Sequence, residues 1–204
     1  SSGTTGYPKG VFVPPESPAI DAMNTLTQIC QGLYGIGAQS VYLSPAPLYH
    51  AAPLRFCMTT MRLGGTVVIM EHFEPERFLA LVQQYRATHT QVVPTMFVRM
   101  LKLPQATRGA FDVSSLQFAI HAAAPCPVPI KEQMIDWWGP VIWEYYAGTE
   151  GNGMTMVRSA DWLAHKGTVG KAVIGQLRIC DELGEEVPTG QIGTIYFAGG
   201  KSFA

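Results

Sequence analysis

The sequence predicts an α/β fold: a mostly parallel sheet of five or more strands with helices on both faces, followed by the start of a small antiparallel β module. Short apolar, β-rich runs alternate with helical patterns through most of the chain, and this alternation is typical of parallel sheets covered on both faces. Several helical patterns open near a proline, which the first turn of a helix tolerates. After about Thr168, two strand-like runs follow each other with only turn signals between them, which indicates antiparallel pairing.

The elements are expected in a regular order along the chain. Parallel strands are expected at residues 41–44, 66–70, 90–93, 116–121 and 141–145. Helices are expected around residues 21–34 and at 47–63, 75–87, 94–103 and 127–138. In the third of these, Phe78, Leu81, Val82 and Tyr85 fall on one helical face. The antiparallel strands are expected at 176–180 and 191–197.

Composition excludes several classes of protein. The 204 residues are 47% hydrophobic and 14% charged with a formal net charge of −1, which excludes a disordered chain and argues against a nucleic-acid partner. No apolar run approaches the roughly 18 residues that a transmembrane segment needs. The four cysteines are scattered without a C-x-x-C pair, so we expect neither a zinc site nor a disulfide framework, and a cytoplasmic location.

The strongest local signal is the glycine-rich opening, SSGTTGYPKG at residues 1–10. Glycines free the backbone to turn and present N–H groups, hydroxyls add donors and a lysine adds a charge, a combination that suits a polyphosphate. It is not a Walker A loop, because Gly10 follows Lys9 where serine or threonine is required. Taken alone, a stretch of this composition is also compatible with a plain polar chain start.

This opening resembles the phosphate-binding loop of the adenylate-forming superfamily, which includes acyl-CoA and aryl-CoA synthetases. The family pattern S-G-T-T-G-x-P-K-G is matched from Ser2 to Gly10. The resemblance implies that Thr4, Thr5 and Lys9 hold the β- and γ-phosphates of ATP, with Thr4 and Lys9 in catalytic roles. The remaining members of the implied ATP-binding loop are Ser2, Gly3 and Gly6.

A second motif, EYYAGTEG at residues 144–151, follows a predicted strand. A carboxylate at the C-terminal edge of a strand can hold a cation where α/β sheets bind ligands, and Mg²⁺ needs few protein carboxylates when phosphates are present. The alternative is that Glu150 is a solvent-exposed residue of a turn without a bound cation. The string resembles the family's Y-G-x-T-E motif, with Ala147 where glycine is usual. The resemblance implies a catalytic Thr149, Glu150 as catalytic residue and Mg²⁺ ligand, and nucleotide contacts from Tyr145, Tyr146, Ala147 and Gly148.

Two weaker segments also resemble the family. Residues 122–127, AAAPCP, take the place of its G-G-A-P-L-P adenine loop, which implies cofactor contacts from Ala123, Ala124 and Pro125. A simple turn between strand and helix is the alternative. Residues 45–50 resemble its P-L-[YF]-H segment, so that His50 would line the acid-binding pocket. A structural histidine is the alternative there.

The motifs run in the family's order over the whole length, which implies two parts. Residues 1–167 would be the α/β nucleotide-binding subdomain and residues 168–204 a partial β subdomain. By the resemblance, the ribose-binding aspartate and the catalytic lysine of the family lie outside the chain. We therefore expect a truncated core that is inactive alone.

The resemblance implies an acid–thiol ligase as the parent enzyme. It would use ATP and Mg²⁺ to convert a carboxylic acid to acyl-AMP, and then coenzyme A to form acyl-CoA. The EYY-x-x-TEG and AAAPCP variants resemble bacterial fatty-acid, bile-acid or steroid-side-chain CoA ligases more than amino-acid adenylation domains. By this resemblance we expect a medium- or long-chain fatty acid as the small-molecule substrate. The alternatives are an adenylation domain that loads a carrier protein and a nucleotide-binding module without catalysis.

Overall fold

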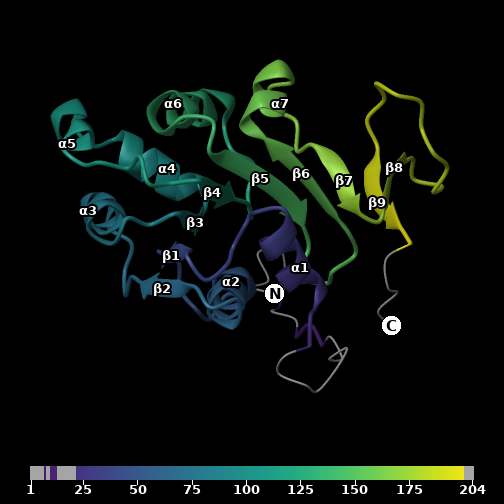
Figure 1. Cartoon of the computed structure of the whole chain (residues 1–204). Helices are drawn as coiled ribbons and strands as arrows, with labels where there is room; N and C mark the ends of the chain where they lie inside the picture. The colour runs from purple at the N-terminus through teal and green to yellow at the C-terminus, as the bar shows by residue number, and fades with distance from the viewer. Residues whose placement is uncertain (1–6, 8–9, 13–21, 200–204) are drawn as a thin grey trace.

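The computed structural model describes Tyr7, residues 10–12 and residues 22–199, and the following account concerns these residues (Figure 1). Most of them form one seven-stranded sheet in the order β2-β1-β3-β4-β5-β6-β7. The first five strands in this order pair in parallel, β6 then pairs antiparallel with β5, and β7 pairs antiparallel with β6. The strands are β1 (Val41–Ser44), β2 (Thr66–Ile69), β3 (His89–Val92), β4 (Phe118–His121), β5 (Ile142–Ala147), β6 (Met154–Arg158) and β7 (Lys171–Ile174).

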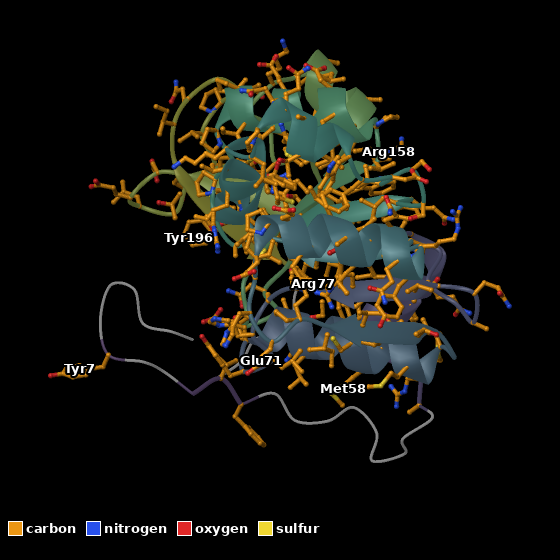
Figure 2. The ribbon with its side chains drawn as sticks, turned by 90° about the vertical axis from the view of Figure 1, so that its left-hand side faces the viewer. Tyr7, Met58, Glu71, Arg77, Arg158 and Tyr196 are labelled. Carbon is orange, nitrogen blue, oxygen red and sulfur yellow. The ribbon has the colours of Figure 1, made fainter. Side chains whose placement is uncertain are left out.

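Helices cover both faces of this sheet, as the sequence predicts. They are α1 (Thr25–Gly32), α2 (Ala51–Arg62), α3 (Pro75–Tyr85), α4 (Pro94–Leu101), α5 (Gln105–Gly109), α6 (Val128–Trp138) and α7 (Ser159–Ala164). One core contains Phe78, Phe97 and Trp138 from α3, α4 and α6, and the other contains Cys30 and Phe56 from α1 and α2. Because neighbouring strand residues point to opposite faces, a parallel strand contributes to both cores. Figure 2 places Met58 of α2 and Arg158 before α7 on opposite sides of the layered structure.

The C-terminal part forms a separate antiparallel sheet of two strands, β8 (Gln176–Cys180) and β9 (Thr194–Ala198). This hairpin lies beside β7 at one end of the chain's main sheet (Figure 1). The chain passes from the large sheet to the small one at Gly175, between β7 and β8. The fold class is therefore confirmed. The division into domains at residue 167 stays a prediction, and β7, which lies beyond it, is a strand of the large sheet.

Several element boundaries differ from the prediction for local reasons. The helix expected from residue 47 begins at Ala51, because residues 47–50 form a turn first and Pro53 then occupies the first helical turn. The sequence prediction missed α5, β6, α7 and β7, which are short and carry no sustained apolar period. Among the described residues, no helix combines the length and apolar character that crossing a bilayer requires.

Candidate functional site

The C-terminal ends of the parallel strands meet at one edge of the sheet, and the described motif segments follow these ends. β4 ends at His121 and β5 at Ala147, and the two strands are neighbours with His121 opposite Glu144. The segment after β4 and the turn after β5 therefore lie next to each other. In open α/β sheets this edge is where ligands bind.

The segment that follows β4 is open to solvent. Ala123, Ala124 and Pro125 are exposed, whereas Cys126 is half-buried. Ala123 has a backbone φ of 77°, a left-handed conformation that favours glycine because a Cβ is crowded there. The chain thus adopts a glycine-like bend with an alanine, in the segment predicted to contact adenine.

The end of β5 presents its two tyrosines to opposite faces of the sheet. Tyr146 is 43% exposed. Tyr145 points into the other core, where its hydroxyl accepts a 2.6 Å hydrogen bond from Gln91 Nε2. Burial, which this hydrogen bond opposes, raises the pKa of Tyr145 to about 12. On the side where Tyr146 lies, Tyr145 can therefore contribute its main chain and not its ring, because strand side chains alternate between faces.

The turn after β5 carries Gly148, Thr149 and Glu150, all exposed. The Gly151 amide closes the turn with a 3.1 Å hydrogen bond to the Gly148 carbonyl. A Cβ added at Gly148 would lie 3.0 Å from Glu150 Oε2, so the carboxylate folds back over the turn. Among the described residues, no three His, Cys, Asp or Glu side chains form a metal cluster. One accessible carboxylate fits Mg²⁺ when phosphate oxygens and water supply the other ligands.

His50 lies at the same edge of the sheet, after β1, and is the N-cap residue of α2. It is exposed, and its ring centroid is 4.5 Å from that of Tyr49. β1 is separated from β4 by β3, so the structure does not bring His50 into the pair of segments after β4 and β5. The strand order reverses between β1 and β3, and ligands bind at such a switch point. Ser2, Gly3, Thr4, Thr5, Gly6 and Lys9 lie outside the described residues.

Sequence reasoning missed a buried polar cluster behind the two segments. Lys131 Nζ donates a 2.5 Å hydrogen bond to Glu144 Oε2, and His121 Nε2 lies 3.4 Å from the same oxygen without hydrogen-bonding geometry. Burial, with the Lys131 charge as the second cause, lowers the pKa of His121 to about 3. Burial also lowers the pKa of Lys131, although the hydrogen bond from Lys131 to Glu144 opposes that shift. The sequence offers one signal for this cluster, because Lys131 and Glu144 are charged residues within otherwise apolar helix and strand patterns.

The family pattern described as "AMP-binding enzyme" matches residues 1–203. The chain belongs to the AMP-binding enzyme family. This match confirms the family resemblance that the sequence motifs carry.

Curated relatives in this family include CoA-forming enzymes. A feruloyl-CoA synthase of an Amycolatopsis species is 31% identical over 202 residues, which cover 98% of this chain and 40% of the relative. The medium/long-chain-fatty-acid–CoA ligase FadD8 of Mycobacterium tuberculosis is 30% identical over 204 residues, which cover 98% of this chain and 34% of the relative. The chain thus spans about two fifths or less of these relatives.

Solved structures agree with the fold. The crystal structure of the ATP-bound RpMatB-BxBclM chimera B1 has a TM-score of 0.74 and 28% identity, over 98% of this chain and 39% of that one. ATP-bound MatB from Rhodopseudomonas palustris has a TM-score of 0.67 and 26% identity, over 86% of this chain and 35% of that one. The individual site residues of this AMP-binding enzyme remain predictions.

Proposed function

We propose that the protein carrying this chain activates a carboxylic acid with ATP and then transfers the acyl group to coenzyme A. The proposal is supported above all by the two neighbouring segments, after β4 and β5, at the edge of the sheet where ligands bind. It is also supported by the names of the relatives, a feruloyl-CoA synthase and a fatty-acid–CoA ligase. The four free cysteines, of which three are buried, fit a cytoplasmic location.

In the first step, a carboxylate oxygen attacks the α-phosphorus of ATP, the bond to the leaving phosphate oxygen breaks, and acyl-AMP and pyrophosphate form. Such a step needs positioning and charge neutralisation more than covalent participation by the protein. Lys9, Thr4 and Thr5 would hold the β- and γ-phosphates, and Thr149 the α-phosphate region. Tyr146 would pack on the adenine, with Ala147, Gly148 and the segment at Ala123–Pro125 completing its contacts.

Glu150 is the residue that would hold Mg²⁺ together with the phosphates of ATP. When bound there, the ion would offset negative charge on those phosphates. In the second step, the coenzyme A thiol attacks the acyl carbonyl, loses its proton, and the carbon–oxygen bond to AMP breaks. His50 would line the acid-binding pocket near the start of α2.

For the acid we propose a medium- or long-chain fatty acid. An aromatic acid is the second candidate, since feruloyl-CoA synthase and 4-coumarate–CoA ligase 3 of Arabidopsis thaliana are among the relatives. A carrier-protein adenylation domain and a catalytically silent nucleotide-binding module are the alternatives. We also propose that the 204-residue chain alone does not convert an acid to its acyl-CoA.

The decisive experiment is carboxylate-dependent exchange between ATP and pyrophosphate in the complete protein, measured with fatty, aromatic, steroid and amino acids. Exchange with fatty acids alone is expected, followed by CoA-thioester formation. Exchange with aromatic acids alone would replace the proposed substrate. Exchange with no acid, despite binding of Mg-ATP, would contradict the proposed activity.

The role of Glu150 is tested separately by Glu150→Ala. We expect exchange to fall by about 10²–10³-fold, by analogy with the removal of one oxyanion-hole donor. Glu182→Ala, at an exposed turn in the hairpin, is the matched control and should leave exchange unchanged. Full exchange by Glu150→Ala at low Mg²⁺ would contradict the metal role.

A further inference from the structure

The buried cluster of Lys131, Glu144 and His121 lies behind the candidate nucleotide site and is assigned no role by the proposed chemistry. The three residues come from α6, β5 and β4, and the side chains of Lys131 and Glu144 are 0% and 8% exposed. Lys131 Nζ also lies 4.8 Å from the ring centroid of Trp162 on α7. Buried charges are retained only when paired, so Lys131 and Glu144 must be considered together.

Both ends of the segment after β4 lie near one carboxylate oxygen, Glu144 Oε2, but only the Lys131 end is hydrogen-bonded to it. His121 is the last residue before that segment, and Lys131 is the fourth residue of the helix that follows it. Both approach Glu144 Oε2, at 3.4 Å and 2.5 Å. Cys126, inside the segment, is close enough that the charges of Lys131 and Glu144 influence its pKa, which burial raises to about 11.

The same glutamate belongs to the strand that carries the second motif. Glu144 and Tyr146 are two residues apart on β5, so their side chains share one face of the sheet. The segment after β4 contains Ala123 in a left-handed conformation. Such a conformation persists only when the surrounding structure enforces it. The Lys131–Glu144 pair ties the α6 end of the segment to β5, and the pairing of β4 with β5 at His121 and Glu144 fixes its other end, an arrangement suited to that task.

We propose that Lys131 and Glu144 are a positioning pair that sets the segment 122–127 against the end of β5, so that both bind the nucleotide together. This inference rests on the proposed function, because that function makes the two segments a nucleotide site. Lys131 touches neither substrate nor reacting atoms and acts through the segment. Its loss should therefore weaken nucleotide binding and leave the acid-binding step unaffected.

The test uses two variants of the complete protein. Lys131→Met keeps the length of the side chain, removes its charge and leaves Glu144 buried without its partner. Lys131→Met/Glu144→Met removes both charges, and replacing a buried ion pair by apolar residues of similar volume often restores stability. The Kd for Mg-ATP, the KM for ATP, the KM for the acid and the free energy of unfolding are measured for each.

We expect both variants to raise the Kd and KM for ATP by about tenfold or more, with the KM for the acid within about twofold of wild type. Only the double variant should recover wild-type stability. A purely structural pair would behave differently, because ATP affinity would then recover together with stability in the double variant. That recovery would overturn the inference. If Lys131→Met does not fold, the double variant carries the same test alone.

The chain offers a matched control in an ion pair whose glutamate lies on the same helix, α6. Lys166 pairs with Glu132, next to Lys131 in sequence, at 2.6 Å, but the two side chains are 51% and 33% exposed. Exposed pairs contribute little, so Lys166→Met should leave ATP binding unchanged. A tenfold loss there would overturn the inference as well. If wild type shows no exchange with any acid, the proposed function fails, whereas unchanged ATP affinity in the Lys131 variants contradicts only the positioning pair.

Discussion

The seven-stranded sheet and the β8–β9 hairpin bury their strands to very different extents. Every residue of β3 is buried, whereas the first three residues of β9 are exposed. A two-stranded sheet is at best marginally stable by itself, so the hairpin depends on what it touches. Phe197 of β9 stacks on Tyr146 with ring centroids 6.4 Å apart and packs over Gly153. The large sheet is stabilised by its own core, and the hairpin by its contact with the end of β5 and the turn that follows it.

The largest difference should appear when one aromatic ring is removed from each region. Phe78 is fully buried and stacks on Trp138 at 6.0 Å. Phe78→Ala should lower the free energy of unfolding by about 3–5 kcal/mol. Tyr196→Ala, at a hairpin residue that is 49% exposed, should change it by less than about 0.5 kcal/mol. Urea unfolding monitored by circular dichroism measures both, and equal effects would contradict the contrast between the regions.

The contact between the two regions should respond to a single methyl group. A Cβ at Gly153 would lie 2.1 Å from Phe197 Cδ1, so Gly153→Ala forces the ring or the hairpin to move. Overpacking of this kind costs about 1–3 kcal/mol. Hydrogen exchange should show the loss in β8 and β9 first.

Two further variants decide whether the Gly153→Ala effect comes from the contact with Phe197. Gly32→Ala has open space around its Cβ and serves as the control. Phe197→Ala removes the clashing ring. The free energy of unfolding of the double variant Gly153→Ala/Phe197→Ala should therefore fall by less than the sum of the two single effects. Strict additivity would show that the two residues are not coupled.

Acid should act on the sheet and not on the hairpin, which contains no histidine. Burial lowers the pKa of His121 to about 3, against 6.5 for an ordinary histidine. The unfolded chain therefore binds more protons between these values, and stability falls as pH drops below 6.5. Between pH 6.5 and pH 5, His121 should lower the free energy of unfolding by about 2 kcal/mol.

Burial also lowers the pKa of His89, which adds to this slope. His121→Gln should flatten the dependence of stability on pH, while the control His72→Gln, 86% exposed, should follow wild type. Urea unfolding at each pH gives the comparison. A variant lacking His121 that retains the full slope would place the acid sensitivity elsewhere.

The sequence predicts the features that depend on neighbouring residues and misses those that depend on contacts between distant parts of the chain. The strand at residues 41–44 was predicted at its observed bounds, because a short apolar run between helical patterns carries its own signal. The start of α2 was not, because the turn at residues 47–50 decides where the helix begins. β6 owes its strand conformation to pairing with β5 across a glycine-rich turn. At the candidate site, the motif segments could be found as strings, but the Lys131–Glu144 pair joins residues that meet only after folding.

The smallest predicted effect concerns how the two regions make left-handed turns. In the hairpin and at its junctions, every described residue with positive φ is a glycine: Gly175, Gly184, Gly190 and Gly199. The sheet edge instead places Ala123 at φ 77°. Relief of about 1–2 kcal/mol of strain, less about 0.4–1 kcal/mol of added chain entropy in the unfolded state, should make Ala123→Gly more stable by roughly 0.5–1 kcal/mol.

The neighbouring Ala124 provides the matched control for this last change, because it has no positive φ. Ala124→Gly should therefore lower the free energy of unfolding by about 0.4–1 kcal/mol, since only the added conformational entropy of the unfolded chain applies there. Opposite signs for two adjacent alanines, measured by urea unfolding, would locate the strain at Ala123. If both substitutions destabilise equally, the left-handed alanine is not strained. A more stable Ala123→Gly protein with weaker ATP binding would further show that the strained bend serves the nucleotide site, because strain held at a site is relieved only at the expense of its geometry.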